Sequence, residues 1–282
     1  MTPIKYEPFK SPHEFASTMY TMFAVYLSES AELFDFHHLQ DTEDLRIICQ
    51  ETTEQEVGFP TSPALEKAIQ DCALIENPWT RVSSLTPHGS WCGWATTRVR
   101  SIAHKVEIPN GSPFLPGGPL FKELAYGVVI DYYTVISADY IIEHGPDHWA
   151  LMIKDHSSLD QDKFGNGKDY ILKSEILGAS AIFHNQMVHM RENDRMNRYD
   201  TTFRYPGGVL AATIVTFIIG KVRVVQATCD PSKEQPSLVF TLRALSDFKL
   251  SCYDKITAKK IVKWVLCPPN PPQALSMRSK KA

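Results

Sequence analysis

Cys252 and His148 are the two residues whose types and predicted positions would together support covalent chemistry. Cys252 precedes an amphipathic segment near the end of the chain, and His148 stands at the head of an apolar segment far upstream. A cysteine thiol becomes a nucleophile when its pKa is lowered and a base lies within hydrogen-bonding distance. The pair therefore predicts thiol chemistry at a carbonyl carbon, with Cys252 as the nucleophile and His148 as the base that activates it.

The sequence around Cys252 predicts a helix start that would lower the pKa of the thiol. Ser251 and Asp254 have the spacing of a capping box, in which the serine oxygen accepts a backbone N–H and the carboxylate reaches back. Apolar residues then recur with helical spacing and form one stripe: Ala258, Ile261, Val262, Val265 and Leu266. We expect a helix from Cys252 to Leu266, because unpaired N–H groups in its first turn would favour the thiolate.

Two apolar segments carry the histidines that such a thiol would need. The segment from Asp147 to Ile153 predicts a strand with His148 at its head. His184 lies in a second predicted strand, from Ala181 to Met187. A catalytic base needs a third group to orient it, and His184 is the expected third member.

The segment Asp147-His148-Trp149-Ala150-Leu151 resembles the histidine strand of the circularly permuted NlpC-like, papain-related proteins, a group that includes lecithin:retinol acyltransferase. In that group a second histidine lies on a neighbouring strand, and the nucleophilic cysteine follows later in the chain at the start of a helix. Phe183-His184 is similar to the second-histidine strand, and the resemblance covers Tyr126 to Leu266. It implies a papain-related fold for this part of the chain, with Cys252, His148 and His184 as the catalytic residues.

The chain departs from this group in two places. Ser251-Cys252 stands where the group usually has an Asn-Cys pair, and the insertion between the two histidine strands is long. With these departures, the resemblance implies a thiol-dependent acyl-transfer enzyme that acts on a small molecule and needs no cofactor. Hydrolysis of an amide or thioester, acyl transfer and acyl cyclisation all fit this chemistry.

Two other functions stay open. A cofactor-independent isomerase or cyclase of small-molecule metabolism would use the histidines between His144 and His189 without the thiol. A non-catalytic binding or interaction protein would use the same residues for structure alone. Cysteine is among the most buried residue types, and a histidine on an apolar strand is usually a hydrogen-bonded core residue.

Three tryptophans are candidates for binding the substrate. Trp149 follows His148 directly, and Trp91 and Trp94 lie in a predicted loop that is rich in proline and glycine. Aromatic side chains of this kind line apolar ligand pockets. They also commonly join two parts of a fold, so both readings are kept.

A metal site is not predicted. Three histidines and several carboxylates gather between Glu143 and His156, which is enough in kind for a metal ion. If residues 149–155 form a strand, however, His148 and His156 lie roughly 26 Å apart at the usual rise. The sequence also lacks the P-loop, G-x-G-x-x-G, G-x-S-x-G and H-E-x-x-H motifs, so it gives no sign of a nucleotide site, a serine hydrolase or a zinc protease.

Composition narrows the class of protein. A 282-residue chain with 43% hydrophobic residues can bury a substantial core. The net charge of −3 is spread along the sequence, so no nucleic-acid partner is predicted. The six cysteines include no C-x-x-C pair, and we expect reduced thiols and a cytoplasmic location. No apolar stretch is long and uncharged enough to predict a membrane span. The oligomeric state is left open.

The secondary-structure pattern predicts an α+β fold. Ser11-Pro12 and Ser62-Pro63 begin two helices, the second reaching about Ile75, and define a mainly helical N-terminal region, residues 1–108. A proline- and glycine-rich segment, residues 109–119, separates it from a β-rich α+β domain, residues 120–270. The expected strands are listed by residue numbers: 126–136, 149–153, 181–187, 201–205, 210–219, 222–227 and 238–242.

We expect these strands to form an antiparallel sheet or partial barrel, followed by the C-terminal helix. The nearly continuous apolar segment from Leu210 to Ile219 should be its central strand, because an apolar edge strand invites aggregation. Gly220-Lys221 should form the hairpin turn to the next strand.

Overall fold

The computed structural model describes residues 9–36, 39, 45–51, 58–72, 90–106, 112–113, 118–126, 128–130, 133–156, 169–192, 209–218, 220–248 and 253–270. We call these the described residues. Their helices and strands follow one another as α1 (Pro12–Ser28), β1 (Leu33–Asp35), β2 (Arg46–Glu51), α2 (Pro63–Gln70), α4 (Ser90–Lys105), β3 (Ser112–Pro113), α5 (Pro119–Tyr126), β4 (Val128–Ile130), β5 (Tyr133–Glu143), β6 (His148–Asp155), β7 (Tyr170–Leu172), α6 (Lys173–Glu192), β8 (Leu210–Ile218), β9 (Lys221–Cys229), β10 (Ser237–Asp247) and α7 (Lys255–Leu266). The predicted α+β class is confirmed.

The main sheet has the strand order β2-β10-β9-β8-β6-β5-β3, and β4 pairs with β5. In the described residues it is an open sheet and not a closed barrel. Two of its pairs, β6 with β8 and β2 with β10, are parallel, so the expectation of an entirely antiparallel sheet is wrong. Parallel neighbours need a long crossover connection. Between β6 and β8 the chain supplies α6, which the sequence pattern did not reveal as a helix.

β8 is central, as predicted, because it pairs with β6 on one side and β9 on the other. The turn between β8 and β9 contains Gly220 with φ 71°, a backbone conformation that residues with a Cβ rarely adopt. The predicted hairpin at this position is confirmed.

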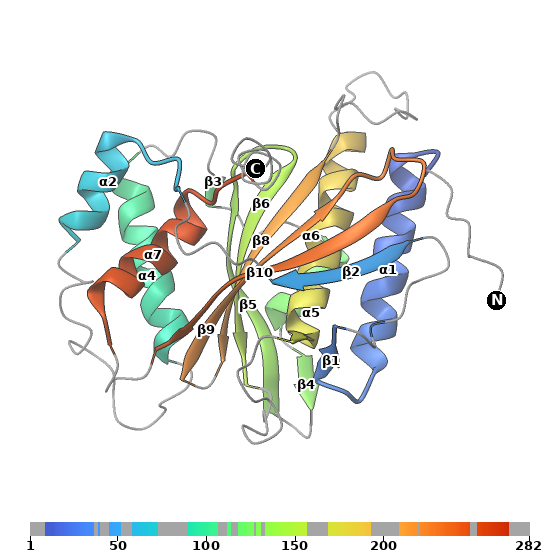
Figure 1. Cartoon of the computed structure of the whole chain (residues 1–282), viewed down its shortest axis with the longest axis horizontal. Helices are drawn as coiled ribbons and strands as arrows, with labels where there is room; N and C mark the ends of the chain where they lie inside the picture. The colour runs from blue at the N-terminus through green and yellow to red at the C-terminus, as the bar shows by residue number, and fades with distance from the viewer. Residues whose placement is uncertain are drawn as a thin grey trace, which may run out of the picture.

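The sheet is covered by helices on both faces (Figure 1). α1, α5 and α6 lie on one face, and α2, α4 and α7 lie on the other. Residues that alternate along each strand enter two separate hydrophobic cores. In β6, Leu151 packs in the core under α1 and α6, whereas Met152 packs in the core under α4 and α7. We call these the α6 face and the α7 face.

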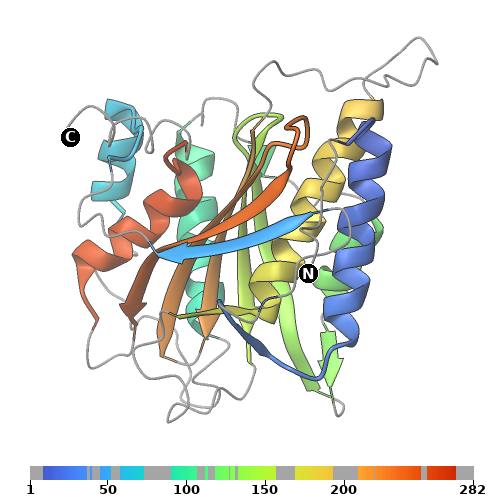
Figure 2. The same ribbon diagram turned by 45° about the vertical axis from the view of Figure 1, so that its right-hand side comes forward.

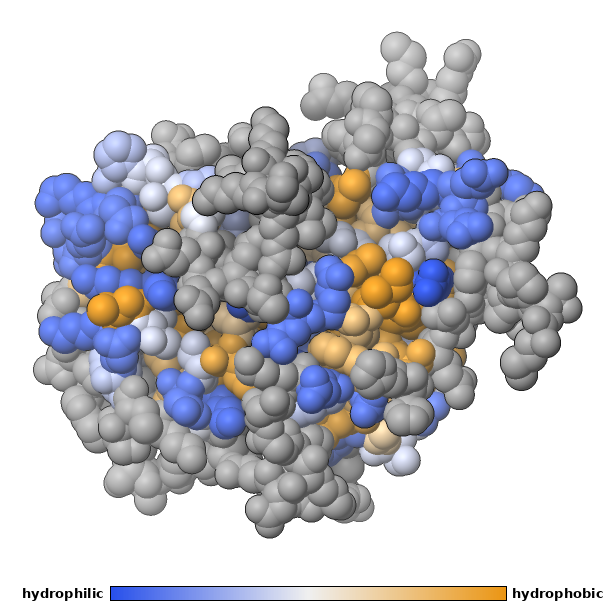
Figure 3. Space-filling model, in the orientation of Figure 1, coloured by the Kyte–Doolittle hydropathy of each residue, from blue (hydrophilic) through white to orange (hydrophobic). Residues whose placement is uncertain are grey.

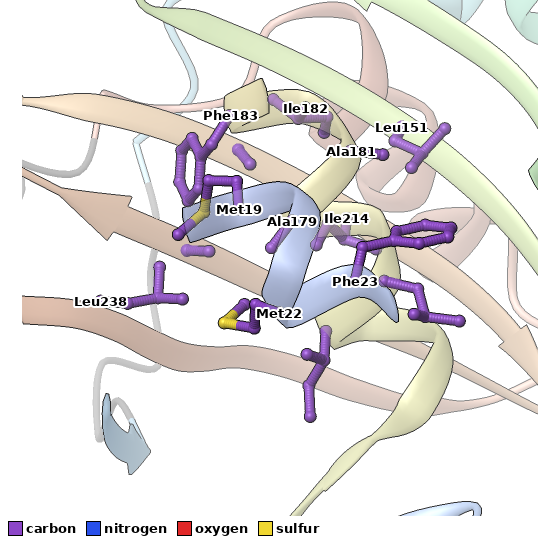
Figure 4. Close-up of a cluster of buried hydrophobic side chains, with 14 of the residues drawn as sticks. Met19, Met22, Phe23, Leu151, Ala179, Ala181, Ile182, Phe183, Ile214 and Leu238 are labelled. Carbon is purple, nitrogen blue, oxygen red and sulfur yellow. The ribbon is translucent and has the colours of Figure 1, made fainter. Parts of the chain in front are cut away.

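The core of the α6 face is built around α6, which lies between the sheet and α1 (Figure 4). Phe183 and Ile182 of α6 lie among residues from α1 and the sheet, including Met19 and Ile214. A Cβ added at Gly178 would come 2.8 Å from Ile153 Cδ1, so the helix approaches β6 very closely there. α6 is therefore almost completely buried, which is unusual for a helix that connects two strands.

The helix starts in the first third follow the predicted chemistry. Ser11 caps α1 and its Oγ accepts the backbone N–H of Glu14 at 3.2 Å. Ser62 caps α2 in the same way, with the N–H of Leu65 at 3.1 Å. Proline occupies the first turn of both helices, where its missing N–H costs nothing. α2 ends at Gln70, earlier than expected.

Other predicted elements differ from the structure. The expected strand from Ala181 to Met187 lies inside α6, because burial on all sides removes the polar positions that reveal a helix. The expected strand from Tyr126 to Ile136 is divided among the end of α5, β4 and the start of β5. The predicted strand 201–205 lies outside the described residues.

Elements from both predicted segments, 1–108 and 120–270, share the same sheet and layers. β2 of the first segment pairs with β10 of the second along Arg46–Glu51, and Figure 2 shows the two strands side by side. α1 packs against α6. The first third therefore supplies an edge strand and part of both helical layers.

The surface in the orientation of Figure 3 shows hydrophobic residues in several places between hydrophilic ones. Such a mixture is ordinary for a folded domain of this size. None of the helices in the described residues has the length and hydropathy that crossing a bilayer requires, in agreement with the expectation of no membrane span.

Ile214→Asp is expected to abolish soluble expression. Ile214 is 0% exposed at the centre of β8, and burying a carboxylate there costs at least several kcal/mol, on the order of the whole stability of a domain. The same substitution at Ile256, which is 66% exposed on α7, is the matched control and should leave the protein soluble. Comparing the soluble fractions of the two variants is the measurement, and a soluble, folded Ile214→Asp protein would contradict the central position of β8.

Candidate functional site

The helix that was predicted to begin at Cys252 begins three residues later. α7 starts at Lys255, and Asp254 is its N-cap, with Oδ2 accepting the backbone N–H of Thr257 at 2.8 Å. Ser251 and Asp254 are both good capping residues, and the aspartate takes that place. Cys252 itself lies outside the described residues. Because it precedes the N-cap, the predicted first-turn position, which was the reason to expect a lowered thiol pKa, is wrong.

The two ends of α7 have different neighbours. Next to its start, the ring of Tyr253 lies 5.9 Å from that of Trp94 and 5.8 Å from that of Phe248. Near its end, the carbonyl of Val265 accepts a hydrogen bond from His144. At 1.5 Å per residue, about 15 Å of helix separates Lys255 from Val265. The described structure next to Cys252 is thus at the far end of α7 from the histidines.

His148 begins β6, as predicted, and lies on the α7 face. Its side chain is 8% exposed, and its Nε2 lies 2.9 Å from Thr213 Oγ1 on the neighbouring strand β8. Burial lowers the pKa of His148 to about 3, and the nearby ring of His144 lowers it further in the same direction. The imidazole is therefore neutral at pH 7.

Thr213 connects His148 to a chain of hydrogen bonds. Gln226 on β9 donates from Nε2 to Thr213 Oγ1 at 3.0 Å and to the carbonyl of Pro269 at 2.9 Å. Because a carbonyl only accepts, the amide orientation of Gln226 is fixed. Thr213 accepts from Gln226 and keeps its own hydroxyl proton for His148 Nε2, which would then be the unprotonated ring nitrogen.

His144 lies beside His148, with ring centroids 5.7 Å apart. Its Nε2 donates to the carbonyl of Val265 at 2.8 Å, which assigns the proton to that nitrogen. Burial lowers the pKa of His144 to about 4, although the bond to Val265 acts in the opposite direction. We call His144, His148, Thr213 and Gln226 the histidine network. It joins β5, β6, β8 and β9 to the end of α7 and the segment after it.

His184 is separated from this network by the sheet. It lies on α6 instead of a strand, and its ring is 6.1 Å from that of Tyr20 on α1. Burial lowers its pKa. Since α1 and α6 cover the face opposite α7, His184 cannot orient His148 in this arrangement, contrary to the expectation from the sequence.

The predicted substrate-binding tryptophans are not gathered at one place. Trp149 is 1% exposed in the core of the α6 face, where its ring stacks with Phe121 at 6.3 Å. Trp94 lies in α4 and not in a loop, on the α7 face, with Arg98 4.5 Å above its ring. Trp91 also belongs to α4, but its side chain lies outside the described residues.

A different cysteine lies at a helix start, and the sequence reasoning did not select it. Cys92 is in the first turn of α4, and its Sγ lies 3.7 Å from Asp139 Oδ2, which also accepts the hydroxyl of Thr96. Burial raises the pKa of the Cys92 thiol, and the Asp139 carboxylate adds to that rise. Cys92 is therefore a protonated core thiol and not an activated nucleophile. The helix start alone would have suggested the opposite.

A buried ion pair lies on the α6 face. Arg223 and Glu175 are both 0% exposed, with Arg223 Nε 2.8 Å from Glu175 Oε1. Glu175 Oε2 also accepts the backbone N–H of Leu172 and so caps α6, while Arg223 donates to the carbonyl of Tyr170. The proximity of Glu175 raises the pKa of Arg223 against the effect of burial. The pair fixes the start of α6 against β9, which is a structural task.

The described geometry thus contains one group of buried titratable side chains at the predicted histidine strand, and it is hydrogen-bonded within itself. No group of three or more histidine, cysteine or acidic side chains in the described residues is arranged to hold a metal ion. A comparison of the sequence with known protein families and curated proteins finds no match.

Thr213→Val is expected to destabilise the fold by about 1–3 kcal/mol, because the change keeps the shape and leaves Gln226 and His148 without their shared partner. The matched control is Thr241→Val on β10, where the hydroxyl of Thr241 accepts only an exposed bond from Gln50. The free energy of unfolding from urea titration is the measurement. Equal values for the two variants would mean that the histidine network contributes nothing to stability.

Proposed function

We propose that this chain is a non-catalytic binding or interaction protein in which His148 and His144 are structural residues. The observation that carries the proposal is the bond between His148 Nε2 and Thr213 Oγ1 inside the sheet. A general base must reach the proton that it removes from a substrate or nucleophile. The nitrogen that would do so is already engaged with a threonine that is 0% exposed.

The wider arrangement supports the same reading. The three predicted catalytic positions have different surroundings: His148 on the α7 face, His184 on the α6 face, and Cys252 before the start of α7. In contrast, the histidine network connects four strands to two backbone carbonyls that follow each other closely in sequence, those of Val265 and Pro269. Neutral histidines in such a position satisfy backbone groups that burial would otherwise leave unpaired.

His148→Ala is expected to lower the free energy of unfolding by about 2–4 kcal/mol, since it leaves a cavity and an unpaired Thr213 hydroxyl. In a chain of this size the melting temperature should fall by about 2–4 °C per kcal/mol. His104→Ala, on the exposed last turn of α4, is the matched control and should change stability by less than about 0.5 kcal/mol.

Thermal unfolding followed by circular dichroism compares the two variants. If His148→Ala melts with the wild type, His148 is not structural and the proposal fails. A large drop for His104→Ala as well would show that histidine truncation in general disturbs this chain, which would also remove the support.

A thiol-dependent acyl-transfer enzyme is the second proposal, and one observation favours it. His148 heads β6, as the resemblance to the papain-related group implies, and is neutral at pH 7, the form that accepts a proton from a thiol. In this proposal Cys252 attacks the carbonyl of a small-molecule substrate and His148 takes the thiol proton. His184 has no part in it, because it lies on the other face of the sheet.

The thiol proposal predicts selective alkylation. With iodoacetamide at pH 6 and peptide mass mapping, Cys252 should react well ahead of the other five cysteines, because only a thiolate reacts. His148→Gln should then slow the labelling of Cys252 by about tenfold or more, while His104→Gln should leave it unchanged. Cys252 that labels no faster than an unfolded control peptide, or that ignores the His148 substitution, rejects the thiol proposal.

A further inference from the structure

The end of α7 is held to the sheet through the histidine network. His144 donates to the carbonyl of Val265 in the last turn of the helix, and Gln226 donates to the carbonyl of Pro269 just beyond it. Between them, Cys267 is the C-cap and is 6% exposed. These bonds attach residues 265–269 to β5 and β9, so this short segment depends on the protonation state of two buried histidines.

The network has no place for a further proton. His148 Nε2 accepts the hydroxyl proton of Thr213, and a proton added to that nitrogen would set two donors against each other. His144 already donates from Nε2, so its second proton would make an imidazolium 5.7 Å from the ring of His148. Two such charges repel strongly in a buried site. Protonation therefore opposes the closed arrangement at both rings.

The groups around the two histidines do not compensate for this charge. Glu143 ends β5 and Asp147 precedes β6, while α7 brings Lys263 and Cys267. β8 and β9 present the uncharged Thr213 and Gln226, and the exposed last turn of α4 carries His104 and Lys105. Of these charged groups, none is a cause of the pKa shift at either ring: burial lowers both, and each ring's other influence is listed above as His144 or Val265.

We propose that the histidine network is an acid-operated latch, in which protonation of His144 and His148 releases the last turn of α7 and residues 267–270 from the sheet while the rest of the fold stays closed. The latch rests on the structural role that the proposed function gives to His148. It adds a regulated element to that function, because the released segment exposes the end of the α7 face to solvent.

The pH range follows from the direction of the shifts. The closed state binds protons with pKa values of about 4 and about 3, whereas an exposed histidine has a pKa near 6.5. The closed state therefore keeps its full advantage above about pH 6.5 and loses it as the pH falls toward 4. At pH 5 the two histidines together should favour the open state by about 10³-fold relative to pH 7.5, or about 30-fold each.

Cys267 reports on the latch directly, because it becomes accessible only when the segment leaves the sheet. The experiment measures its reaction with 4,4′-dithiodipyridine from pH 7.5 to pH 4.5 on the full chain, followed by peptide mass mapping. Each rate is divided by the rate for the guanidinium-unfolded chain at the same pH, which removes the ordinary titration of the thiol. Cys229, 1% exposed in β9, is the internal control for global unfolding.

The expected result is a rise of Cys267 labelling by about 10²–10³-fold between pH 7.5 and pH 5, with a much smaller rise at Cys229. His148→Gln and His144→Gln should each reduce the rise by about 30-fold, and the double variant should abolish most of it. His104→Gln should keep the full rise. If His148→Gln does not fold, His144→Gln still tests the latch, because it removes one titrating ring and leaves Thr213 in place.

Cys267 labelling that is flat between pH 7.5 and pH 5, or that rises only together with Cys229, overturns the latch. A rise that persists unchanged in His144→Gln overturns it as well. These results are independent of the melting experiment: a flat pH profile with a destabilised His148→Ala protein rejects the latch and leaves the proposed function standing, whereas an undisturbed His148→Ala protein rejects both.

Discussion

The parallel pairing of β6 with β8 is the constraint on which most of the described arrangement depends. Parallel neighbours cannot be joined by a tight turn, so the chain between them must cross one face of the sheet, and it does so as α6. Close approach at Gly178, whose added Cβ would meet Ile153 at 2.8 Å, sets this helix against the strands. α1 then covers its outer side. His184 travels with the crossover and is placed on the face opposite His148, which no side-chain rotation can reverse.

Burial of both faces of the sheet explains why the polar residues within it are paired. On the α6 face the charges of Arg223 and Glu175 neutralise each other with both side chains fully buried. On the α7 face Thr213 and Gln226 occupy the same strands, and without partners each would lose at least one hydrogen bond to water. His148 and the carbonyl of Pro269 supply those partners. The histidine network is thus what a doubly covered sheet requires once threonine and glutamine stand at these positions.

Local chemistry in the sequence predicted the elements that have local causes. Ser11-Pro12 and Ser62-Pro63 began helices, and Gly220 turned a hairpin, because capping and a positive φ act within a few residues. The strand headed by His148 was predicted for the same reason. α6 was not, since a helix buried on every side shows no 3.6-residue polar period. The start of α7 was displaced because Asp254 and Ser251 compete for one cap. The parallel pairs and the separation of the histidines depend on long-range packing, which no short motif encodes.

The same energetics link the two roles considered for His148. A catalytic base must become an imidazolium during the reaction, and a shift from about 6.5 to about 3 means that charging this ring in place costs about 5 kcal/mol. That cost would slow any proton transfer through it by more than three orders of magnitude. Catalysis by His148 would therefore require the ring first to leave Thr213 and meet water. The movement that frees the ring in this way is the release of residues 267–270, so a thiol chemistry at this strand would depend on the open latch, whereas binding or structural work needs it closed.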